Sequence, residues 1–424
     1  MKNFLDKFFS RSSNLDYISQ NLKKISLKTP VGRIFDAINN VSDTSEIRYV
    51  GGCVRKVINQ EPVDDIDLAT NLTPKEVCAA LDEKKINYYE SGIEHGTITA
   101  LIDDSKFEIT SLRKDVVTDG RHAKVEFSKN WKEDASRRDF TINSIYSDID
   151  GNLFDPFDGK NDLENGKVKF IGDVDLRIKE DYLRILRYLR FFLNYSKHKH
   201  KSEIIKTIKR NINGISNLSS ERLIEELKKL ASSNGILNLF NDQESIELIE
   251  TIFPQLKNFH KFKKLNAYAA KNLLKIDFIF LISLLVIDGT DNIDYFIYKF
   301  KISKKNQKRL KLIDNFYRKK NSIKNFTEKN FNKIFFFNGK QAVMDIINYK
   351  LFHSVKVEKK LTKLLEIYKN KELPKVPISA DMLMKKFNIP EGKILGIKLK
   401  MIEEIWAENS FKISDKQIQK IVKS

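Results

Sequence analysis

The first third of the chain alternates short apolar runs with turn residues, a pattern typical of short strands. Four runs have the length and the β-branched or aromatic content of strands, at 47–50 (IRYV), 63–68 (VDDIDL), 98–102 (ITALI) and 107–112 (FEITSL). Gly51-Gly52 breaks the chain directly after the first run. The pattern predicts a strand-containing head over roughly residues 30–150.

Helical patterns lie between these runs. Residues 30–42 read as a short helix, with Thr29 as its N-cap and Pro30 at its first position. A second helical stretch, 54–58, follows the two glycines, and the segment 73–76 (TPKE) has the capping-box pattern that opens a third. The head therefore mixes helices with strands.

The pattern changes after Asp155-Pro156-Phe157, and from about Leu176 onward nearly every segment has helical periodicity. On residues 183–192, leucines and a phenylalanine form one stripe and arginines line another side. The apolar run 276–287 is shorter than the roughly 20 residues that span a bilayer and contains Asp277, so we expect a buried core helix and no membrane segment.

Charge is distributed unevenly. The net charge is +19, but residues 1–195 hold 30 Lys and Arg against 33 Asp and Glu, whereas residues 196–424 hold 46 against 24. Such an excess suits a polyanionic partner such as nucleic acid. Lysine-rich, solvated helix faces are the alternative explanation, because Lys greatly outnumbers Arg.

Cysteine content and the N-terminal pattern bear on the compartment. Cys53 and Cys78 are too few for a disulfide framework or a zinc site, and they fit a reducing environment. The first 20 residues show no apolar signal region and no small-residue cleavage site. We therefore expect a cytoplasmic protein.

Asp65 and Asp67 are the leading candidates for chemistry. On a strand, positions i and i+2 point to one face, which would bring the two carboxylates together. Mg²⁺ is bound through one or two carboxylates plus substrate phosphates, and two such ions can assist an in-line displacement. Taken alone, an Asp-x-Asp pattern is more often a solvated acidic turn.

Neighbouring residues add to this pattern. The glycines, Gly52 in particular, would let backbone N–H groups approach a triphosphate, and Arg55 would add a fork of donors. Glu108 lies in the middle of a predicted strand and could complete a metal site or deprotonate an attacking hydroxyl. A tight turn and a solvent-facing strand residue are the simpler explanations.

Two further groups suit nucleotide recognition. Arg138 and Asp139 could contact phosphate and ribose, although a surface ion-pair cluster has the same pattern. Asp181, Arg184 and Arg187 are spaced so that they would face one way on a single helix, where Asp and Arg could bond the edge of a base. An ordinary intrahelical ion pair, contributing about 0.3–0.5 kcal/mol, is the alternative.

Taken in order, these segments resemble the class II CCA-adding tRNA nucleotidyltransferases, with the bacterial poly(A) polymerases as close relatives. The resemblance covers about residues 47–230. The matching stretches are VGGCVRKVIN, VDDIDLAT, HGTITALIDDSKFEITSLRKDVVTDGRHAKVEF, DASRRDFTINSIY, DPFDGKNDLENGKVKFIGD, RIKEDYLRILRYLRFF and SERLIEELKKL.

The resemblance implies a role for each matching residue. Asp65 and Asp67 would bind Mg²⁺, and Glu108 would be the third catalytic carboxylate. The implied nucleotide-binding residues are Gly52, Arg55, Arg138, Asp139, Asp181, Arg184 and Arg187. Asp181 and Arg184 would act as an amino-acid template that pairs with C or A.

The segment 115–122 corresponds to a flexible loop associated with the switch from C to A addition, with Asp115, Asp119 and Arg121 as its candidate residues. One departure from the family pattern is Lys56, where Asp is usual after the arginine. We expect this change to alter local support of the loop and not the chemistry.

The implied fold is α+β, a polymerase β-like nucleotidyltransferase head with a mixed sheet, followed by an all-helical neck, body and tail. We expect an N-terminal extension at 1–28, the head at 29–155, the neck at 156–235, and a tRNA-binding body and tail at 236–424. No His-Asp dyad occurs among the six histidines, so an appended metal phosphohydrolase domain is not expected.

The implied activity is template-independent addition of C, C and A to the 3′ end of tRNA from CTP and ATP, with release of pyrophosphate. A poly(A) polymerase is the first alternative, but the interval SGIEHGTITALIDDSKFE lacks the extra basic and aromatic segment of those enzymes. A catalytically inactive RNA-binding relative is the second alternative.

Overall fold

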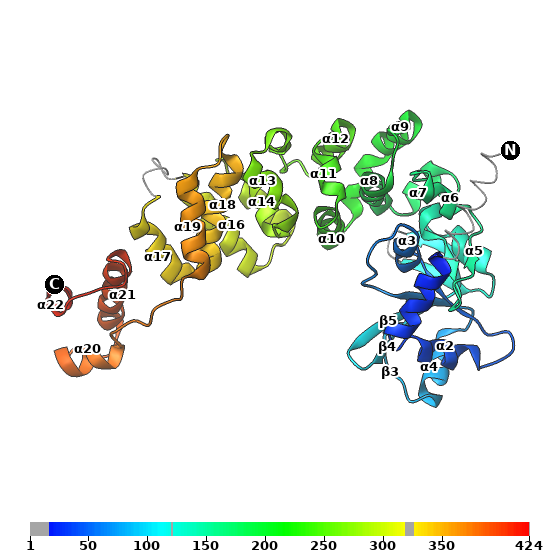
Figure 1. The fold of residues 1–424 in the computed structure, drawn as a ribbon, viewed down its shortest axis with the longest axis horizontal. Coiled ribbons are helices and arrows are strands. Elements are labelled where there is room, and N and C mark those ends of the chain that lie inside the picture. The colour runs from blue at the N-terminus through cyan, green and yellow to red at the C-terminus, as the bar shows by residue number, and fades with distance from the viewer. Residues whose placement is uncertain (1–16, 120–121, 319–325, 424) are drawn as a thin grey trace. The chain divides into compact units, whose positions relative to one another are not determined.

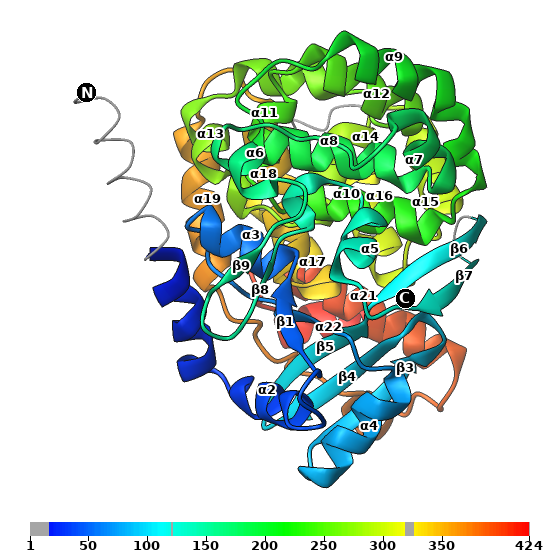
Figure 2. The same cartoon turned by 90° about the vertical axis from the view of Figure 1, so that its right-hand side faces the viewer.

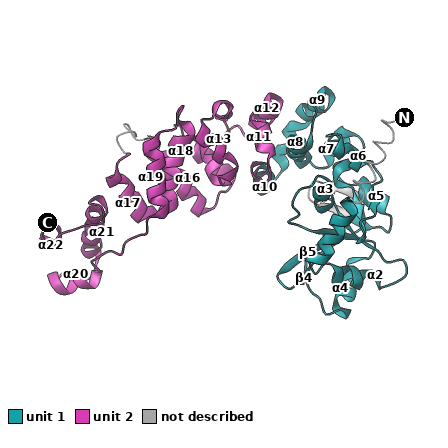
Figure 3. Ribbon diagram, viewed as in Figure 1, with its two compact units in different colours: residues 1–227 teal, residues 228–424 magenta. Residues whose placement is uncertain are grey.

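The structure is a computed structural model that describes residues 17–119, 122–318 and 326–423. It divides into two compact units, residues 1–227 and 228–424 (Figure 3). The border falls within helix α10 (Ser220–Ala231). The finer division into extension, head, neck and body stays a prediction.

The first unit is built on a seven-stranded sheet with the order β3-β4-β5-β2-β1-β8-β9 (Figures 1 and 2). Its strands are β1 (Ile47–Val50), β2 (Asp67–Thr70), β3 (Asn87–Gly92), β4 (Thr97–Ile102), β5 (Ser105–Ser111), β8 (Tyr146–Ser147) and β9 (Leu153–Phe154). β2 and β5 run parallel, and the other neighbouring strands are antiparallel. The predicted mixed sheet is confirmed.

Alternating burial explains why these segments are strands. Along β4, Ile98, Ala100 and Ile102 are buried, and the residues between them are only partly buried. Helices α2 (Gly32–Asn39), α3 (Gly52–Ile58) and α4 (Pro74–Glu83) pack beside the sheet. The predicted capping box is present at α4, where the Thr73 hydroxyl accepts from the Glu76 N–H and the Glu76 carboxylate accepts from the Thr73 N–H.

Several local expectations differ from the structure. The first predicted helix begins at Gly32 with Val31 as its N-cap, because the Thr29 hydroxyl bonds back to Ile25 O at the end of a helix over residues 17–28. The sequence analysis missed β3, whose run NYYESG is largely polar. It also missed a separate hairpin of β6 (Arg113–Asp119) and β7 (His122–Phe127), visible in Figure 2.

The rest of the first unit is mostly helical. Its elements are α5 (Trp131–Ser136), η2 (Thr141–Asn143), α6 (Gly159–Glu164), α7 (Val174–Glu180), α8 (Leu183–Tyr195), α9 (Ser202–Asn211) and η3 (Ile212–Asn217). Leu186, Leu189 and Phe192 of α8 are buried, as the predicted stripe requires. The arginines of α8 lie on its other side, where they take part in the candidate site.

The second unit is built from helices throughout its described residues. Its larger helices are α12 (Gln243–Ile252), α14 (Phe278–Val286), α15 (Asn292–Lys299), α16 (Lys304–Arg318), α17 (Glu328–Asn338), α18 (Lys340–His353), α19 (Lys359–Asn370), α20 (Ala380–Phe387), α21 (Lys393–Glu408) and α22 (Asp415–Lys423). The shorter ones are α11 (Gly235–Leu239), η4 (Phe259–Lys264), α13 (Ala267–Asn272) and η5 (Leu273–Lys275).

Helix α14 is the buried core helix that the apolar run predicts. Asp277 caps it by accepting from the Phe280 N–H at 3.1 Å, and every residue from Phe280 to Val286 is buried. Over the described stretches of the chain, no helix combines the length and the apolar character that crossing a bilayer requires.

Candidate active site

Asp67 and Glu108 lie opposite each other on adjacent parallel strands. Asp67 begins β2, and its Cα partner on β5 is Glu108. Neighbouring strands are about 4.8 Å apart, so the two carboxylates extend from paired positions on adjacent strands. Glu108 thus lies in the middle of a strand, as predicted, and this strand is the neighbour of the one that carries Asp67.

Asp65 lies outside the sheet. The predicted strand 63–68 is wrong in its first half, because β2 starts at Asp67 and Asp65 is an exposed residue of the preceding loop. The pairing strand β1 ends at Val50, and the φ of 65° at Gly51 turns the chain away, so β1 offers no partner to residues 63–66. The two aspartates therefore do not share one strand face.

The acids are nonetheless close enough to repel. Burial raises the pKa of Asp67, and the charges of Glu108 and Asp65 raise it further, while Arg138 and Arg55 oppose the shift. A cation between these carboxylates would relieve the repulsion. Two negative and two positive side chains thus surround the half-buried carboxylate of Asp67.

The glycine turn lies against this cluster. Gly51 needs its positive φ, and a Cβ there would lie 3.5 Å from Nη1 of Arg138. A Cβ on Gly52 would lie 3.7 Å from Oδ2 of Asp67. The turn, Asp67 and Arg138 are therefore neighbours, as the sequence-predicted site requires.

Arg138 is held by a buried carboxylate that the sequence analysis did not single out. Asp134 of α5 is 1% exposed, and its Oδ2 lies 3.3 Å from Nη2 of Arg138 and 2.6 Å from the Tyr146 hydroxyl. Burial alone would raise the pKa of Asp134, but Arg137, Arg138 and Tyr146 lower it to about 2. The i, i+4 spacing of Asp134 and Arg138 was the available signal.

Asp139 orients Arg187 directly and Arg55 through Asn143. Its carboxylate accepts from Nδ2 of Asn143 at 2.8 Å and from Nε of Arg187 at 2.6 Å. Asn143 in turn accepts a hydrogen bond from Arg55. Burial would raise the pKa of Asp139, but Arg187 and Asn143 lower it to about 2. Asn143, which no sequence pattern marked, connects Arg55 to Asp139.

Three guanidinium groups gather around the ring of Phe191. The central carbons of Arg190, Arg55 and Arg187 lie 4.1, 4.8 and 5.5 Å from the ring centroid. Burial lowers the pKa of Arg190, and the charges of Arg187 and Arg55 add to the shift. Arg187 is paired with Asp139 and Arg190 with Glu226, and this cluster of arginines is compatible with a polyphosphate ligand.

Asp181, Arg184 and Arg187 do not share one helix face. Asp181 has an extended backbone between α7 and α8, and its Oδ2 pairs with Nη2 of Arg222 at 2.7 Å. Arg184 pairs instead with Glu180 at 2.5 Å. The expectation of a single helix is wrong because α7 ends at Glu180 and α8 restarts at Leu183.

The segment predicted as a flexible loop is largely strand. Residues 115–119 belong to β6, and His122 begins β7, with Asp119 opposite His122. Arg121 lies outside the described residues. The structure thus fixes the backbone register of Asp115 and Asp119.

Lys56, the departure from the family pattern, forms an ion pair with Asp64. The hydrogen bond from Lys56 lowers the pKa of Asp64. Because Asp64 directly precedes Asp65, this pair ties the aspartate loop to α3.

The donor set fits a metal that also binds substrate. Within the described residues no group of three or more His, Cys, Asp or Glu side chains is arranged to hold a metal ion by itself. Mg²⁺ does not require such a cage, since it is commonly held by one or two carboxylates with substrate phosphates. Asp65 and Asp67, which repel each other here, could supply those carboxylates.

Comparison with known proteins agrees with this geometry. Residues 47–169 match the model of the poly A polymerase head domain. The mitochondrial CCA tRNA nucleotidyltransferase 1 of Mus musculus is 32% identical over 407 residues, an alignment covering 90% of this chain and 87% of that protein. The chain belongs to the CCA tRNA nucleotidyltransferase family.

Some members of the family match only part of the chain. The Homo sapiens mitochondrial CCA tRNA nucleotidyltransferase 1 is 46% identical over 206 residues, and that alignment covers 47% of each chain, so the match spans about half of that relative. The Bacillus stearothermophilus CCA-adding enzyme, solved in complex with CTP, superposes with a TM-score of 0.71 at 19% identity, covering 93% of this chain and 97% of that one. This likeness extends the family fold to the second unit.

Proposed function

We propose that the chain adds C, C and A to the 3′ end of tRNA, using CTP and ATP and releasing pyrophosphate. The observation that carries this proposal is the in-register pair Asp67 and Glu108 beside the Gly51-Gly52 turn, with Arg55 and Arg138 next to it. Membership of the family supports the choice of substrate.

Asp65 and Asp67 would hold Mg²⁺ together with the triphosphate. When bound, Mg²⁺ neutralises charge on the phosphates and on the attacking and leaving oxygens. The raised pKa of Asp67 supports this assignment. Glu108 and Asp65 destabilise the charged form of this carboxylate, and a bound cation would stabilise it.

The side chains around the aspartates position and neutralise the nucleotide. Arg55, Arg187 and Arg190 present guanidinium groups to a polyphosphate, and Arg138 lies against the glycine turn.

In the reaction, the 3′ oxygen of the RNA forms a bond to the α-phosphorus, and the bond from that phosphorus to the oxygen that bridges it to the β-phosphorus breaks. Glu108, exposed beside Asp67, accepts the hydroxyl proton. Positioning and charge stabilisation supply most of the rate.

Nucleobase selection falls to the corner between α7 and α8. The carboxylate of Asp181 is fixed by Arg222, and the guanidinium of Arg184 is fixed by Glu180 and by Arg177 O at 2.7 Å. These partners hold the hydrogen-bonding groups rigidly, which is what reading a base edge requires. Asp115 and Asp119 on the hairpin would take part in the change from C to A addition.

The second unit would bind tRNA through its basic surface, with contacts to backbone and shape as expected for double-stranded RNA.

We also place the protein in the cytoplasm, because both cysteines are free thiols. The mouse and human relatives are mitochondrial by name. Imaging a fluorescent fusion tests the compartment, and mitochondrial staining would overturn the cytoplasmic assignment.

One experiment separates this function from the two alternatives. The protein is incubated with tRNA lacking CCA and with CTP, ATP or both, and the 3′ ends are sequenced. We expect C and CC ends with CTP alone and CCA ends with CTP and ATP together. Long A tails without C would favour a poly(A) polymerase, and unextended tRNA would favour an inactive RNA-binding relative.

The variant Asp65→Ala, Asp67→Ala tests the metal assignment. We expect nucleotide addition to fall by at least about 10³-fold, because removing even one charge-stabilising group typically costs about 10²–10³-fold. Binding of tRNA, measured by filter retention, should stay within a few-fold of the parent. The matched control is Asp103→Ala, Asp104→Ala on the exposed β4–β5 turn, which should leave addition unchanged. Full activity of the first variant would contradict the assignment.

A further inference from the structure

The two most exposed aromatic side chains among the described residues lie on one helix of the second unit. Tyr298 is 86% exposed and Tyr295 is 64% exposed, and both belong to α15. Positions i and i+3 of a helix are neighbours, so the two rings project from the same side of α15. Single apolar groups on a surface are ordinary, whereas two adjacent rings form a patch. The candidate active site uses neither of them.

The opposite side of α15 holds the helix in this orientation. Ile293, Phe296 and Ile297 are buried, and the ring centroids of Phe296 and Phe300 lie 4.8 Å apart. A rotation of α15 that covered the tyrosines would expose these apolar side chains to water. The exposure of the two rings is therefore imposed by the packing of the helix.

Helices α15 and α16 form a helical hairpin, joined by residues 300–303 (Figure 2). Asp294, in the first turn of α15, pairs with Lys311 of α16 at 2.9 Å, so the two helices run side by side in opposite directions. One turn nearer the connection, Tyr298 follows Asp294 by four residues and Lys308 precedes Lys311 by three. These two side chains therefore lie on neighbouring turns of the hairpin.

Lysines continue from the rings along the exposed face of α16. Lys304, Lys308 and Lys311 are spaced i, i+4 and i+7, which places them on one face, and all three are exposed, as is Lys305. Lys311 is paired with Asp294, whereas the other three lysines form no ion pair with any residue that the structure describes. The positive charge at this end of the hairpin is therefore not neutralised.

The acids of α15 lie at its other end. Asp291 is the N-cap of the helix, and Asp294 belongs to its first turn. Tyr298 lies in the last turn, beside the connection to the lysines of α16. A polyanion that contacts the rings would therefore be favoured on the side of the connection and opposed on the side of the N-cap.

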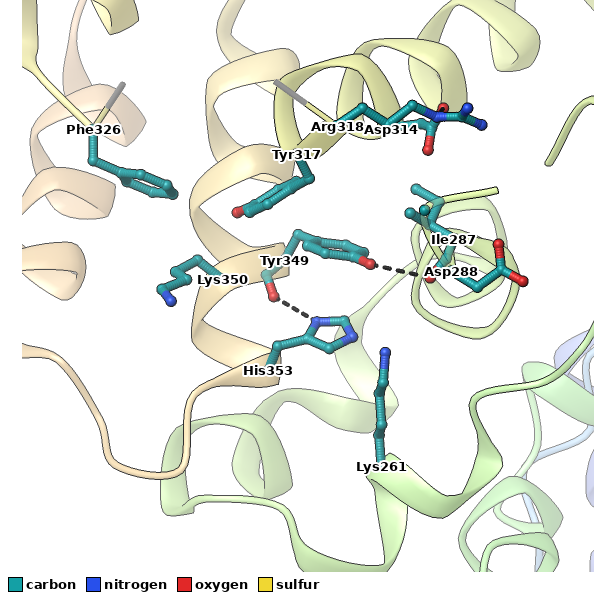
Figure 4. A pocket seen from close by; sticks show the side chains of 11 residues that line it. Lys261, Ile287, Asp288, Asp314, Tyr317, Arg318, Phe326, Tyr349, Lys350 and His353 are labelled. Atoms are coloured by element: carbon teal, nitrogen blue, oxygen red, sulfur yellow. Dashed lines mark hydrogen bonds and ion pairs between the residues drawn. The ribbon is translucent and has the colours of Figure 1, made fainter. Parts of the chain in front are cut away.

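The open end of the hairpin is fixed by Arg318. Figure 4 shows Asp314 and Arg318 side by side at the end of α16, beside a pocket around His353. Nε of Arg318 donates to Oδ2 of Asp314 at 2.6 Å, and its Nη2 donates to Thr290 O, just before α15. The start of α15 is thereby tied to the end of α16, so the rings and the lysines belong to one rigid surface.

We infer that Tyr295 and Tyr298 form a stacking platform for unpaired bases of RNA, with Lys304, Lys305 and Lys308 holding the adjacent phosphates. The inference deepens the proposed function and rests on it, because tRNA is the RNA concerned. Every base has an aromatic face, and exposed rings within a basic surface are the usual means of binding unpaired nucleotides. Lysines without acidic partners favour a polyanion over a neutral protein surface. Phosphate contacts alone would leave the two rings unused.

Binding of tRNA lacking CCA to the full chain, measured by fluorescence anisotropy without CTP or ATP, tests the platform. Stacking of one base on an aromatic side chain strengthens binding about 5–150-fold. We expect Tyr295→Ala, Tyr298→Ala to weaken binding at least about fivefold, and Tyr295→Phe, Tyr298→Phe to stay within about twofold of the parent, because phenylalanine keeps the ring. The matched control is Tyr89→Ala, which removes a tyrosine that is 59% exposed on the edge strand β3 and should leave binding unchanged.

Salt dependence and a paired RNA separate stacking from charge. Tyr295→Ala, Tyr298→Ala should keep the parent's slope of log K against log salt, because a ring releases no counterion. Lys304→Ala, Lys305→Ala, Lys308→Ala should reduce that slope. A long, fully paired RNA duplex should bind the parent and the tyrosine variant equally, since its bases are already stacked on one another.

Weaker binding of tRNA but not of the duplex by Tyr295→Ala, Tyr298→Ala, at the parent's melting temperature, supports the platform. Parent-like binding of tRNA by this variant would overturn it and point to a protein partner for the rings, and an equal loss for tRNA and duplex would also overturn it. Neither measurement requires nucleotide addition. A chain that shows the loss but extends no tRNA refutes the proposed function alone, and an active chain without the loss refutes the platform alone.

Discussion

At the scale of single residues, the buried acids of the first unit are each held by several partners. Asp134 interacts with Arg137, Arg138 and Tyr146, and Asp139 interacts with Asn143 and Arg187. A buried carboxylate with several donors keeps its charge and fixes the direction of the arginines around it. These acids position the arginines that we propose as contacts of the nucleotide.

Asp134→Ala should destabilise the first unit by about 3–5 kcal/mol, because it leaves Arg137 and Arg138 without their buried partner. The pKa of Asp134 is lowered from 3.8 to about 2, so its stabilisation is complete above pH 3.8 and is lost as the pH falls through about 2. Urea unfolding across pH should show a difference from the parent that is full at pH 7 and shrinks below about pH 4.

The exposed carboxylate of Asp104 gives the matched control for this stability measurement. Asp104→Ala should unfold within about 0.5 kcal/mol of the parent at every pH, as surface substitutions generally do. A difference for Asp134→Ala that stays constant from pH 7 to pH 2 would show that lost packing, and not charge pairing, causes the destabilisation.

Arg184→Ala should relax nucleotide selection. The guanidinium is fixed by Glu180 and by backbone carbonyls, and losing one well-placed hydrogen-bonding group typically costs about 1–3 kcal/mol of discrimination. The ratio of kcat/KM for CTP or ATP to that for UTP or GTP should fall about 10–100-fold. Arg210→Ala, which removes an exposed arginine paired with Asp175, is the control. Unchanged exclusion of UTP and GTP by Arg184→Ala would refute the selection role.

At the scale of elements, local signals set most of the head. The β1 segment 47–50 coincides with its prediction, and the α4 cap is the predicted capping box, since both depend on neighbouring residues alone. The start of β2 was misplaced because strand length depends on the partner, and β1 is only four residues long. The β6–β7 hairpin was missed for a similar reason, since its strands pair only with each other.

Shortening this hairpin should separate C addition from A addition. We expect a variant lacking residues 115–122 to make CC ends at a rate within a few-fold of the parent and to stop there. The measurement is sequencing of the 3′ ends when CTP and ATP are both present. Substituting Asp103 and Asp104 with Ala on the β4–β5 turn is the control, and it should give complete CCA. Complete CCA from the shortened chain would remove the hairpin from the switch.

At the scale of the whole molecule, charge and chemistry occupy different parts of the chain. The proposed catalytic acids lie between residues 65 and 108, whereas the excess of Lys and Arg falls in residues 196–424. A polyanion bound along a basic surface releases counterions, which makes its affinity depend on salt. Binding and chemistry should therefore respond separately to substitution.

Salt dependence tests this division. Binding of tRNA lacking CCA should weaken by about 10³-fold or more between 50 and 200 mM salt if six or more phosphates are contacted. Lys304→Ala, Lys305→Ala, Lys308→Ala, which removes exposed charges from α16, should reduce the slope of log K against log salt by up to about 3. Removing Lys84, Lys85 and Lys106 from the head in the same way is the control. Equal slopes for both triple variants would place the RNA surface elsewhere.

The sequence by itself determined the α+β head, the helical remainder and the identity of the candidate acids and arginines, because periodicity, capping and motif spacing are local. Only the tertiary structure decided how those residues are held. Asp181 pairs with Arg222, 41 residues away, and Arg55 bonds Asn143, 88 residues away. The pocket around His353 likewise joins five segments between residues 261 and 353. Such partners are chosen by packing, which no local pattern records.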